Sequence, residues 1–142
     1  MNTKTLQPAE WPRPKGYANG IVARGQTIFV SGQIGWDPSG QFTSDNLTEQ
    51  VGQTLRNIVR VLKEAHAEPR HVVRLTWYVL SREAYLREVR EIGALYREIM
   101  GKHFPAMSVV EVRGLVEQRA QVEIEATAVI PDDQAHGHLA PT

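Results

Sequence analysis

Two glutamates in the last apolar stretch are the side chains of this sequence best suited to chemistry. Glu123 and Glu125 lie within residues 120–130, where apolar and polar residues alternate. The alternation predicts a strand with one core face, and it places both carboxylates on the other face, about 7 Å apart. Burying a carboxylate is costly unless a partner compensates it. Two interpretations stay open: this face meets water, as in many antiparallel sheets, or one glutamate lines a cleft and transfers a proton.

Length and composition narrow the classes of function. The 142 residues suffice for one domain with a real core. Sixteen basic and sixteen acidic side chains give zero net charge, which argues against nucleic acid or an anionic membrane as a partner. The absence of cysteine removes disulfides, thiol nucleophiles and cysteine-based zinc sites. No apolar run suits a signal peptide or a membrane span, so a soluble, cytoplasmic protein is expected.

The elements that must position the glutamates follow from periodicity. Prolines predict an irregular lead-in over residues 1–16, followed by one domain over residues 17–131 and a flexible tail over residues 132–142. Residues 21–23 and 27–31 suggest a hairpin, and residues 37–40 a turn. His136 and His138 in the tail are too weak a signal for a metal site, so none is predicted.

Two helices are expected. The first begins at Asn46, which can cap it with Glu49 three residues on, and ends near His66. The second runs from Ser81 to about Gly101, with a charged, solvated outer face and inward-facing apolar residues that include Leu86 and Val89. Further strands are predicted over residues 72–80, in a central position, and over residues 107–112, with a connection over residues 113–119.

This order predicts an α+β two-layer sandwich, with both helices on one face of a mixed sheet. The other face would present Tyr78, Thr127, Val129 and either Val109 or Val110 beside the two glutamates. Such a surface is too apolar to be simply wet, and it suits packing against copies of the same chain with closed cyclic symmetry.

Several short motifs, in order along the chain, resemble the RidA/YjgF family, whose members are also called endoribonuclease L-PSP or translation inhibitors. They are Gly16-Tyr17, Phe29-Val30-Ser31-Gly32-Gln33, the Glu49-Gln50 to Asn57-Ile58 pattern, Val72-Val73-Arg74, Phe104-Pro105-Ala106 and Val122-Glu123-Ile124-Glu125-Ala126. The resemblance implies a chorismate-mutase-like fold with two helices on a mixed six-stranded sheet. It also implies a homotrimer with clefts between neighbouring subunits.

Active members of that family hydrolyse enamines and imines to a 2-oxo acid and ammonia without a cofactor. The resemblance assigns catalytic roles to Tyr17 and Glu123 and places Ser31 and Gly32 in the strand-end motif of the site. The family's arginine after the Pro-Ala pair, which grips the substrate carboxylate, is replaced here by Met107, and Gly93 stands where an asparagine is common.

Met107 alters what the cleft can bind, because a thioether cannot form the charge-assisted fork that a guanidinium makes with a carboxylate. The expected ligand contacts are Met107 and Ser108, with Trp36 and Trp77 as further apolar lining. A cation from elsewhere, such as Arg24, Arg113 or Arg119, could replace the arginine.

Three functions are therefore open. The first is hydrolysis of C=N bonds with Glu123 transferring the proton. The second is a trimeric small-molecule-binding protein that has lost catalysis, and Met107 could then be an ordinary packed methionine. The third, a ribonuclease, is disfavoured by the zero net charge.

Overall fold

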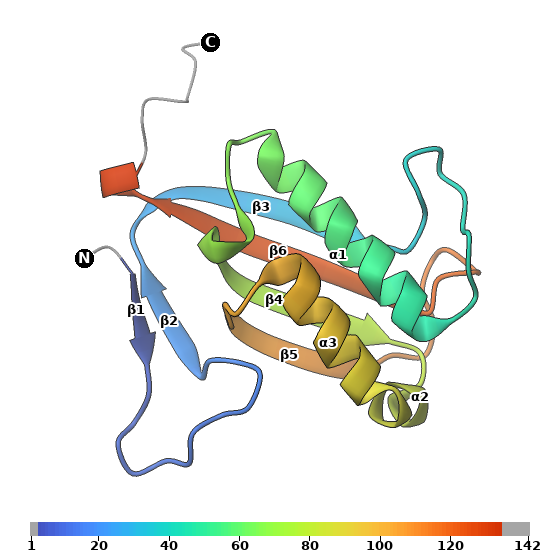
Figure 1. Cartoon of the computed structure of the whole chain (residues 1–142), viewed down its shortest axis with the longest axis horizontal. Coiled ribbons are helices and arrows are strands. Elements are labelled where there is room, and N and C mark those ends of the chain that lie inside the picture. The colour runs from blue at the N-terminus through green and yellow to red at the C-terminus, as the bar shows by residue number, and fades with distance from the viewer. Residues whose placement is uncertain (1–2, 135–142) are drawn as a thin grey trace.

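The computed structural model describes residues 3–134 and has the predicted two layers. A four-stranded sheet is covered on one face by helices α1 and α3 (Figure 1). In chain order the strands are β1 Thr3–Leu6, β2 Gly20–Ala23, β3 Gly25–Gln33, β4 Val72–Val79, β5 Ala106–Glu111 and β6 Val122–Pro131. The helices are α1 Leu47–Lys63, α2 Arg82–Arg87 and α3 Val89–Met100, with 3-10 turns at Pro69–His71 and Asp132–Gln134. No helix among residues 3–134 is long and apolar enough to cross a membrane.

The sheet is mixed, with strand order β3-β6-β4-β5. β6 pairs antiparallel with β3 and β4, while β4 and β5 are parallel. This confirms the interior position predicted for β4, and it leaves β3 and β5 as the two edges. The register between β3 and β6 shifts between Val30 and Gln33, so Ser31 and Gly32 form a bulge opposite β6.

The six strands are divided between two sheets. The predicted hairpin and the predicted irregular lead-in are both corrected by the smaller sheet. β2 pairs with β1 in a separate two-stranded sheet, so the predicted hairpin between residues 21–23 and 27–31 is wrong. Gly25 has φ +149 and lies against the backbone of Ile130 and Pro131, a close approach that only glycine permits where the chain passes from β2 into β3. The lead-in predicted to be irregular contains β1.

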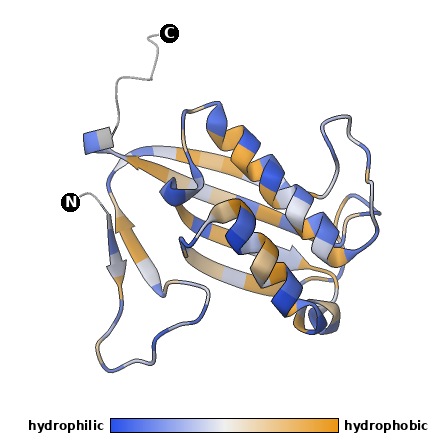
Figure 2. Cartoon of the chain, viewed as in Figure 1, coloured by the Kyte–Doolittle hydropathy of each residue, from blue (hydrophilic) through white to orange (hydrophobic). Residues whose placement is uncertain are grey.

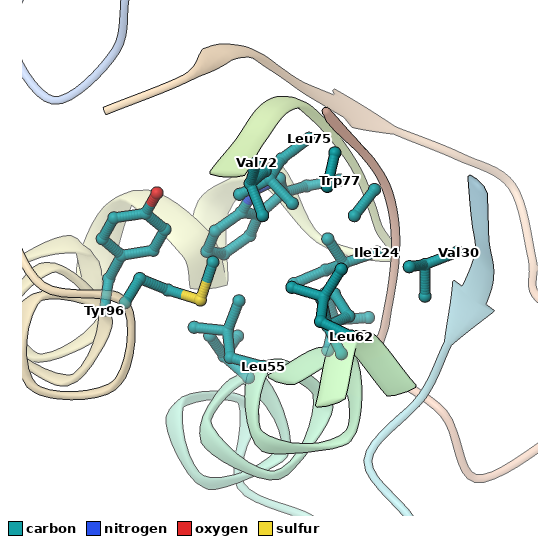
Figure 3. Packing of buried hydrophobic residues seen from close by; sticks show 14 of the residues in the cluster. Val30, Leu55, Leu62, Val72, Leu75, Trp77, Tyr96 and Ile124 are labelled. Atoms are coloured by element: carbon teal, nitrogen blue, oxygen red, sulfur yellow. The ribbon is translucent and has the colours of Figure 1, made fainter. Parts of the chain in front are cut away.

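Helix α1 forms as its sequence predicts. The side chain of Asn46 accepts a hydrogen bond from the Glu49 backbone N–H at 2.9 Å, and this satisfies one of the free donors of the first turn. Its apolar stripe is buried against the sheet, and hydrophobic and hydrophilic residues alternate along α1 and α3 (Figure 2). Figure 3 shows the resulting core, where Leu55 and Leu62 face Val72, Leu75, Trp77 and Ile124.

The second predicted helix is two helices, α2 and α3, which meet at Glu88. Glu88 leaves the helical conformation (φ −103, ψ 12), and its carboxylate accepts hydrogen bonds from the backbone N–H of Thr48 at 3.1 Å and from its hydroxyl at 2.6 Å. Leu86 and Val89, predicted to face inward, are 55% and 43% exposed because of this break. The Ser81 cap is confirmed, with the Ala84 N–H donating to its hydroxyl at 3.0 Å.

Candidate functional site

The sheet face opposite the helices carries both glutamates. Strand alternation and register place the following side chains on it: Phe29 and Ser31 of β3, Glu123, Glu125 and Thr127 of β6, Arg74, Thr76 and Tyr78 of β4, and Ser108 and Val110 of β5. Val110 is thus the β5 valine on this open face, while Val109 packs against the core. Phe29 is 80% exposed, so this face of the single chain is partly apolar and uncovered.

Glu123 lies over the bulge of β3. A Cβ atom on Gly32 would come within 2.7 Å of the Glu123 carboxyl carbon, so only a glycine leaves room for the carboxylate. The Glu123 side chain makes no hydrogen bond or ion pair within residues 3–134. It lines a pocket of about 420 Å³, here called the β3 pocket, with Ser31, Gly32, Gln33, Ile34, Trp36, Val116 and Glu117.

Glu125 has a different environment on the same strand. The Tyr78 hydroxyl donates a hydrogen bond to its Oε1 at 2.6 Å, and this bond raises the pKa of Tyr78 because it stabilises the protonated phenol. Glu125 borders a separate hollow of the open face together with Arg74 and Thr76. The two carboxylates therefore differ in their partners. Glu125 is hydrogen-bonded to Tyr78, whereas Glu123 lines a pocket and has no hydrogen-bonding partner within residues 3–134.

Met107 lies on the helical side of the sheet. Its register partner is the buried Leu75, and it borders a pocket of about 160 Å³ between α3, β4 and β5, here called the α3 pocket. This pocket is lined by Lys15, Gly16, Trp77, Tyr85, Val89, Ile92, Gly93, Tyr96, Arg97, Phe104 and Met107. The rings of Tyr96 and Phe104 are stacked, with centroids 6.1 Å apart and an interplanar angle of 11°. Burial raises the pKa of Tyr85 and of Tyr96, so both phenols stay protonated at neutral pH.

Six of the eight predicted site residues fall into two groups within one chain. Ser31, Gly32, Trp36 and Glu123 line the β3 pocket, whereas Met107 and Trp77 line the α3 pocket. Ser108 faces the open side of β5, away from Met107.

Tyr17 belongs to neither set of lining residues and is 42% exposed. Its segment is docked along the start of β5, since the Ala18 N–H donates to the Pro105 carbonyl at 2.9 Å. Gly16, with φ +79, takes the left-handed conformation at the turn into this segment and so brings Lys15 to the α3 pocket.

None of the three candidate replacement cations lines either pocket. Arg24 pairs with Asp132 at 3.3 Å, and Arg119 pairs with Asp45 at 2.8 Å while lying over the Phe42 ring. Arg113 lines neither pocket. The cations beside Met107 are Lys15 and Arg97, which sequence reasoning missed. The sequence held one signal for Arg97. Gly93, which stands where the family commonly has an asparagine, lies one helical turn before Arg97 on the same helix face.

Two further features bear on ligands. Trp77 Nε1 is a buried donor for which the described part of the chain offers no acceptor. Between residues 3 and 134, no group of three or more metal-ligating side chains could hold an ion. His136 and His138 lie outside the described residues.

The fold and the two pockets define a two-layer α+β protein. In its described residues a carboxylate of β6 without a partner borders a pocket beside the β3 edge, and an aromatic pocket lies beside the β5 edge. A family model described as Endoribonuclease L-PSP matches residues 10–130. The human 2-iminobutanoate/2-iminopropanoate deaminase is 31% identical over 127 residues, which are 89% of each chain. The RutC family protein slr0709 of Synechocystis is 33% identical over 138 residues, covering 92% of this chain and 99% of the relative.

The crystal structure of the Rid family protein YyfB from Yersinia pestis matches with a TM-score of 0.79 at 30% identity, covering 92% of this chain and 100% of the other. The chain therefore belongs to the RidA/YjgF family, as its motifs predicted.

Proposed function

We propose that the protein is a cofactor-free deaminase that hydrolyses small imines or enamines to a carbonyl compound and ammonia. The observation that carries this proposal is Glu123, a carboxylate without a partner among residues 3–134 and held over Gly32 in the β3 pocket. The human relative at 31% identity is named as a deaminase of 2-iminobutanoate and 2-iminopropanoate, which supports the same class of reaction.

The proposed site is assembled between subunits of a homotrimer. The β3 pocket and the α3 pocket lie at opposite edges of one sheet, at β3 and β5. In a cyclic assembly two different surfaces of the same chain meet at each interface. Joining a β3 edge to a neighbour's β5 edge would bring Glu123 of one subunit toward Met107 of the next. The exposed Phe29 on the open face supports such packing, because large apolar side chains gathered on a surface favour association.

The chemistry then requires one proton carrier and no redox step. Glu123 accepts a proton from water as the water oxygen bonds to the imine carbon, and the imine nitrogen becomes an amine. Glu123 passes that proton to the nitrogen to complete this amine. The hydroxyl proton of the adduct then moves through Glu123 to the amine, the C–N bond breaks, and ammonia leaves while the oxygen forms the carbonyl. The hydroxyls of Ser31 and Tyr17 would hold the substrate by hydrogen bonds.

The test compares two neighbouring carboxylates. Ammonia release is measured from 2-iminobutanoate and from neutral imines generated in situ, with wild type, Glu123→Gln and Glu125→Gln. We expect Glu123→Gln to lower turnover at least about a hundredfold, the usual contribution of a positioned acid–base group. Glu125→Gln should keep turnover near the wild-type rate. Equal rates for wild type and Glu123→Gln would exclude the proposed role.

A second function, ligand binding without catalysis, is favoured by Met107, which replaces the arginine expected from the family pattern. It predicts a metabolite that raises the melting temperature and is recovered unchanged after incubation. A ligand that is consumed at a rate that depends on Glu123 would instead support the deaminase.

A further inference from the structure

Two basic side chains line the α3 pocket. Among residues 3–134, its charged lining residues are Lys15 and Arg97, and no carboxylate of this part of the chain lines it. Neither side chain forms a hydrogen bond or an ion pair in the part of the chain that the structure describes. Two exposed cations that border the same hollow attract an anionic ligand group.

Arg97 reaches this pocket over a glycine. The Nη1 atom of Arg97 lies 3.5 Å from the position that a Cβ atom on Gly93 would occupy. An alanine at position 93 would make ordinary contact with the guanidinium, whereas a side chain that extends beyond Cβ would compete with it for the same space. The arginine expected on β5 is Met107, so a guanidinium borders this pocket from helix α3 rather than from the strand.

The rest of the pocket is apolar and offers donors. Trp77, Tyr85, Tyr96 and Phe104 form an aromatic cluster, in which the Trp77 ring lies 6.2 Å from Tyr85 and 6.4 Å from Tyr96. The Tyr96 hydroxyl already donates to the His103 carbonyl at 3.3 Å. The Tyr85 hydroxyl has no acceptor within residues 3–134 and remains available as a donor.

We propose that Arg97, assisted by Lys15, binds the carboxylate of a small ligand whose apolar or aromatic body packs against Met107 and the aromatic cluster. A guanidinium presents paired donors that match a carboxylate, and the ring side chains favour a flat apolar group over a strongly polar one. The inference rests on the proposed function for the identity of that ligand, an imino acid with an apolar side chain. The binding of a carboxylate does not depend on catalysis.

The test uses benzoate and benzamide, which share shape and differ in charge. Dissociation constants are measured by isothermal titration calorimetry with the full-length protein. We expect wild type to bind benzoate more tightly than benzamide, and Arg97→Gln to weaken benzoate binding about tenfold, as for loss of one charged hydrogen-bonding partner. Lys15→Gln should weaken it less. Arg90→Gln, an exposed cation of the same helix outside the pocket, is the matched control and should bind like wild type.

Arg97→Lys keeps the charge but not the fork, so it should bind benzoate with intermediate affinity. Equal affinity of wild type for benzoate and benzamide, no benzoate binding at all, or wild-type affinity in Arg97→Gln would each overturn the proposal. Because neither probe is hydrolysed, these results are independent of Glu123. Loss of turnover in Glu123→Gln with unaltered benzoate binding in Arg97→Gln would leave the deaminase standing and remove this inference alone.

Discussion

Glu123 and Glu125 show how neighbouring identical residues acquire different chemistry. Both are on β6 and share the open face, yet Glu125 is held by the Tyr78 hydroxyl while Glu123 lies over Gly32 without a hydrogen-bonding partner in the described residues. The strand pattern predicted their common face. It could not say which one is free, because that depends on the bulge in β3 and on where Tyr78 reaches across the sheet.

Gly32→Ala tests the position of the Glu123 carboxylate. A Cβ atom at position 32 would lie 2.9 Å from Glu123 Cγ and 2.7 Å from its carboxyl carbon, so the side chain must move. We expect turnover to fall about a hundredfold, since a displacement of about 1 Å can have that effect. The melting temperature should change little, because a flexible side chain yields rather than the backbone.

Gly114→Ala is the control for this substitution, because nothing lies within 4 Å of a Cβ atom at that position. It should retain both turnover and melting temperature. Wild-type turnover in Gly32→Ala would show that catalysis does not depend on the present position of the Glu123 carboxylate.

At the scale of elements, the sequence correctly predicted the features that depend on residues close together in the chain. The Asn46 cap, the buried stripe of α1 and the alternation of β4 and β6 were all predicted correctly. The break between α2 and α3 was missed, since it is stabilised by Glu88 contacting Thr48, forty positions earlier in the chain. The pairing of β2 with β1 was missed for the same reason: adjacency in sequence favours a hairpin, and only the tertiary fold assigns the strands to different sheets.

Glu88→Ala should therefore destabilise the helical layer. It removes two hydrogen bonds at the first turn of α1, one of them to a backbone N–H that has no partner within the helix. We expect the free energy of unfolding, measured with urea, to fall by about 1–2 kcal/mol. Glu91→Ala, in the exposed first turn of α3, should cost less than about 0.5 kcal/mol. Equal losses in the two variants would contradict this role of Glu88.

The packing of α3 on the sheet also predicts a pH dependence. Burial raises the pKa of Tyr96 above its ordinary value of 10.0, so the folded state holds this proton more tightly than the unfolded state. The associated stability is complete below about pH 10 and is lost as pH rises toward the folded-state pKa. Tyr96→Phe should show a smaller decline of the unfolding free energy above pH 10 than wild type. Part of the decline in unfolding free energy with pH should remain in this variant, because the pKa values of Tyr78 and Tyr85 are also raised. An unchanged slope in Tyr96→Phe would contradict this assignment.

At the scale of the whole molecule, the proposed site exists only if chains associate. Neither pocket of one chain contains both Glu123 and Met107, and the open sheet face exposes Phe29 to 80%. Periodicity predicted a face opposite the helices that carries apolar residues beside the two glutamates. It could not predict that Glu123 and Met107 line separate pockets, because that depends on which edges of the sheet the strands β3 and β5 occupy.

Phe29→Glu tests this assembly directly. A carboxylate at an apolar contact must lose its hydration on association, which costs several kcal/mol per interface. We expect sedimentation to show a trimer for wild type and a monomer for Phe29→Glu, with turnover lost in the monomer although Glu123 and Met107 are intact. Leu86→Glu, at an apolar residue of α2 that is 55% exposed on the helical side, should remain trimeric and active. A monomeric wild type, or a monomeric Phe29→Glu that keeps full turnover, would show that one chain holds the complete site.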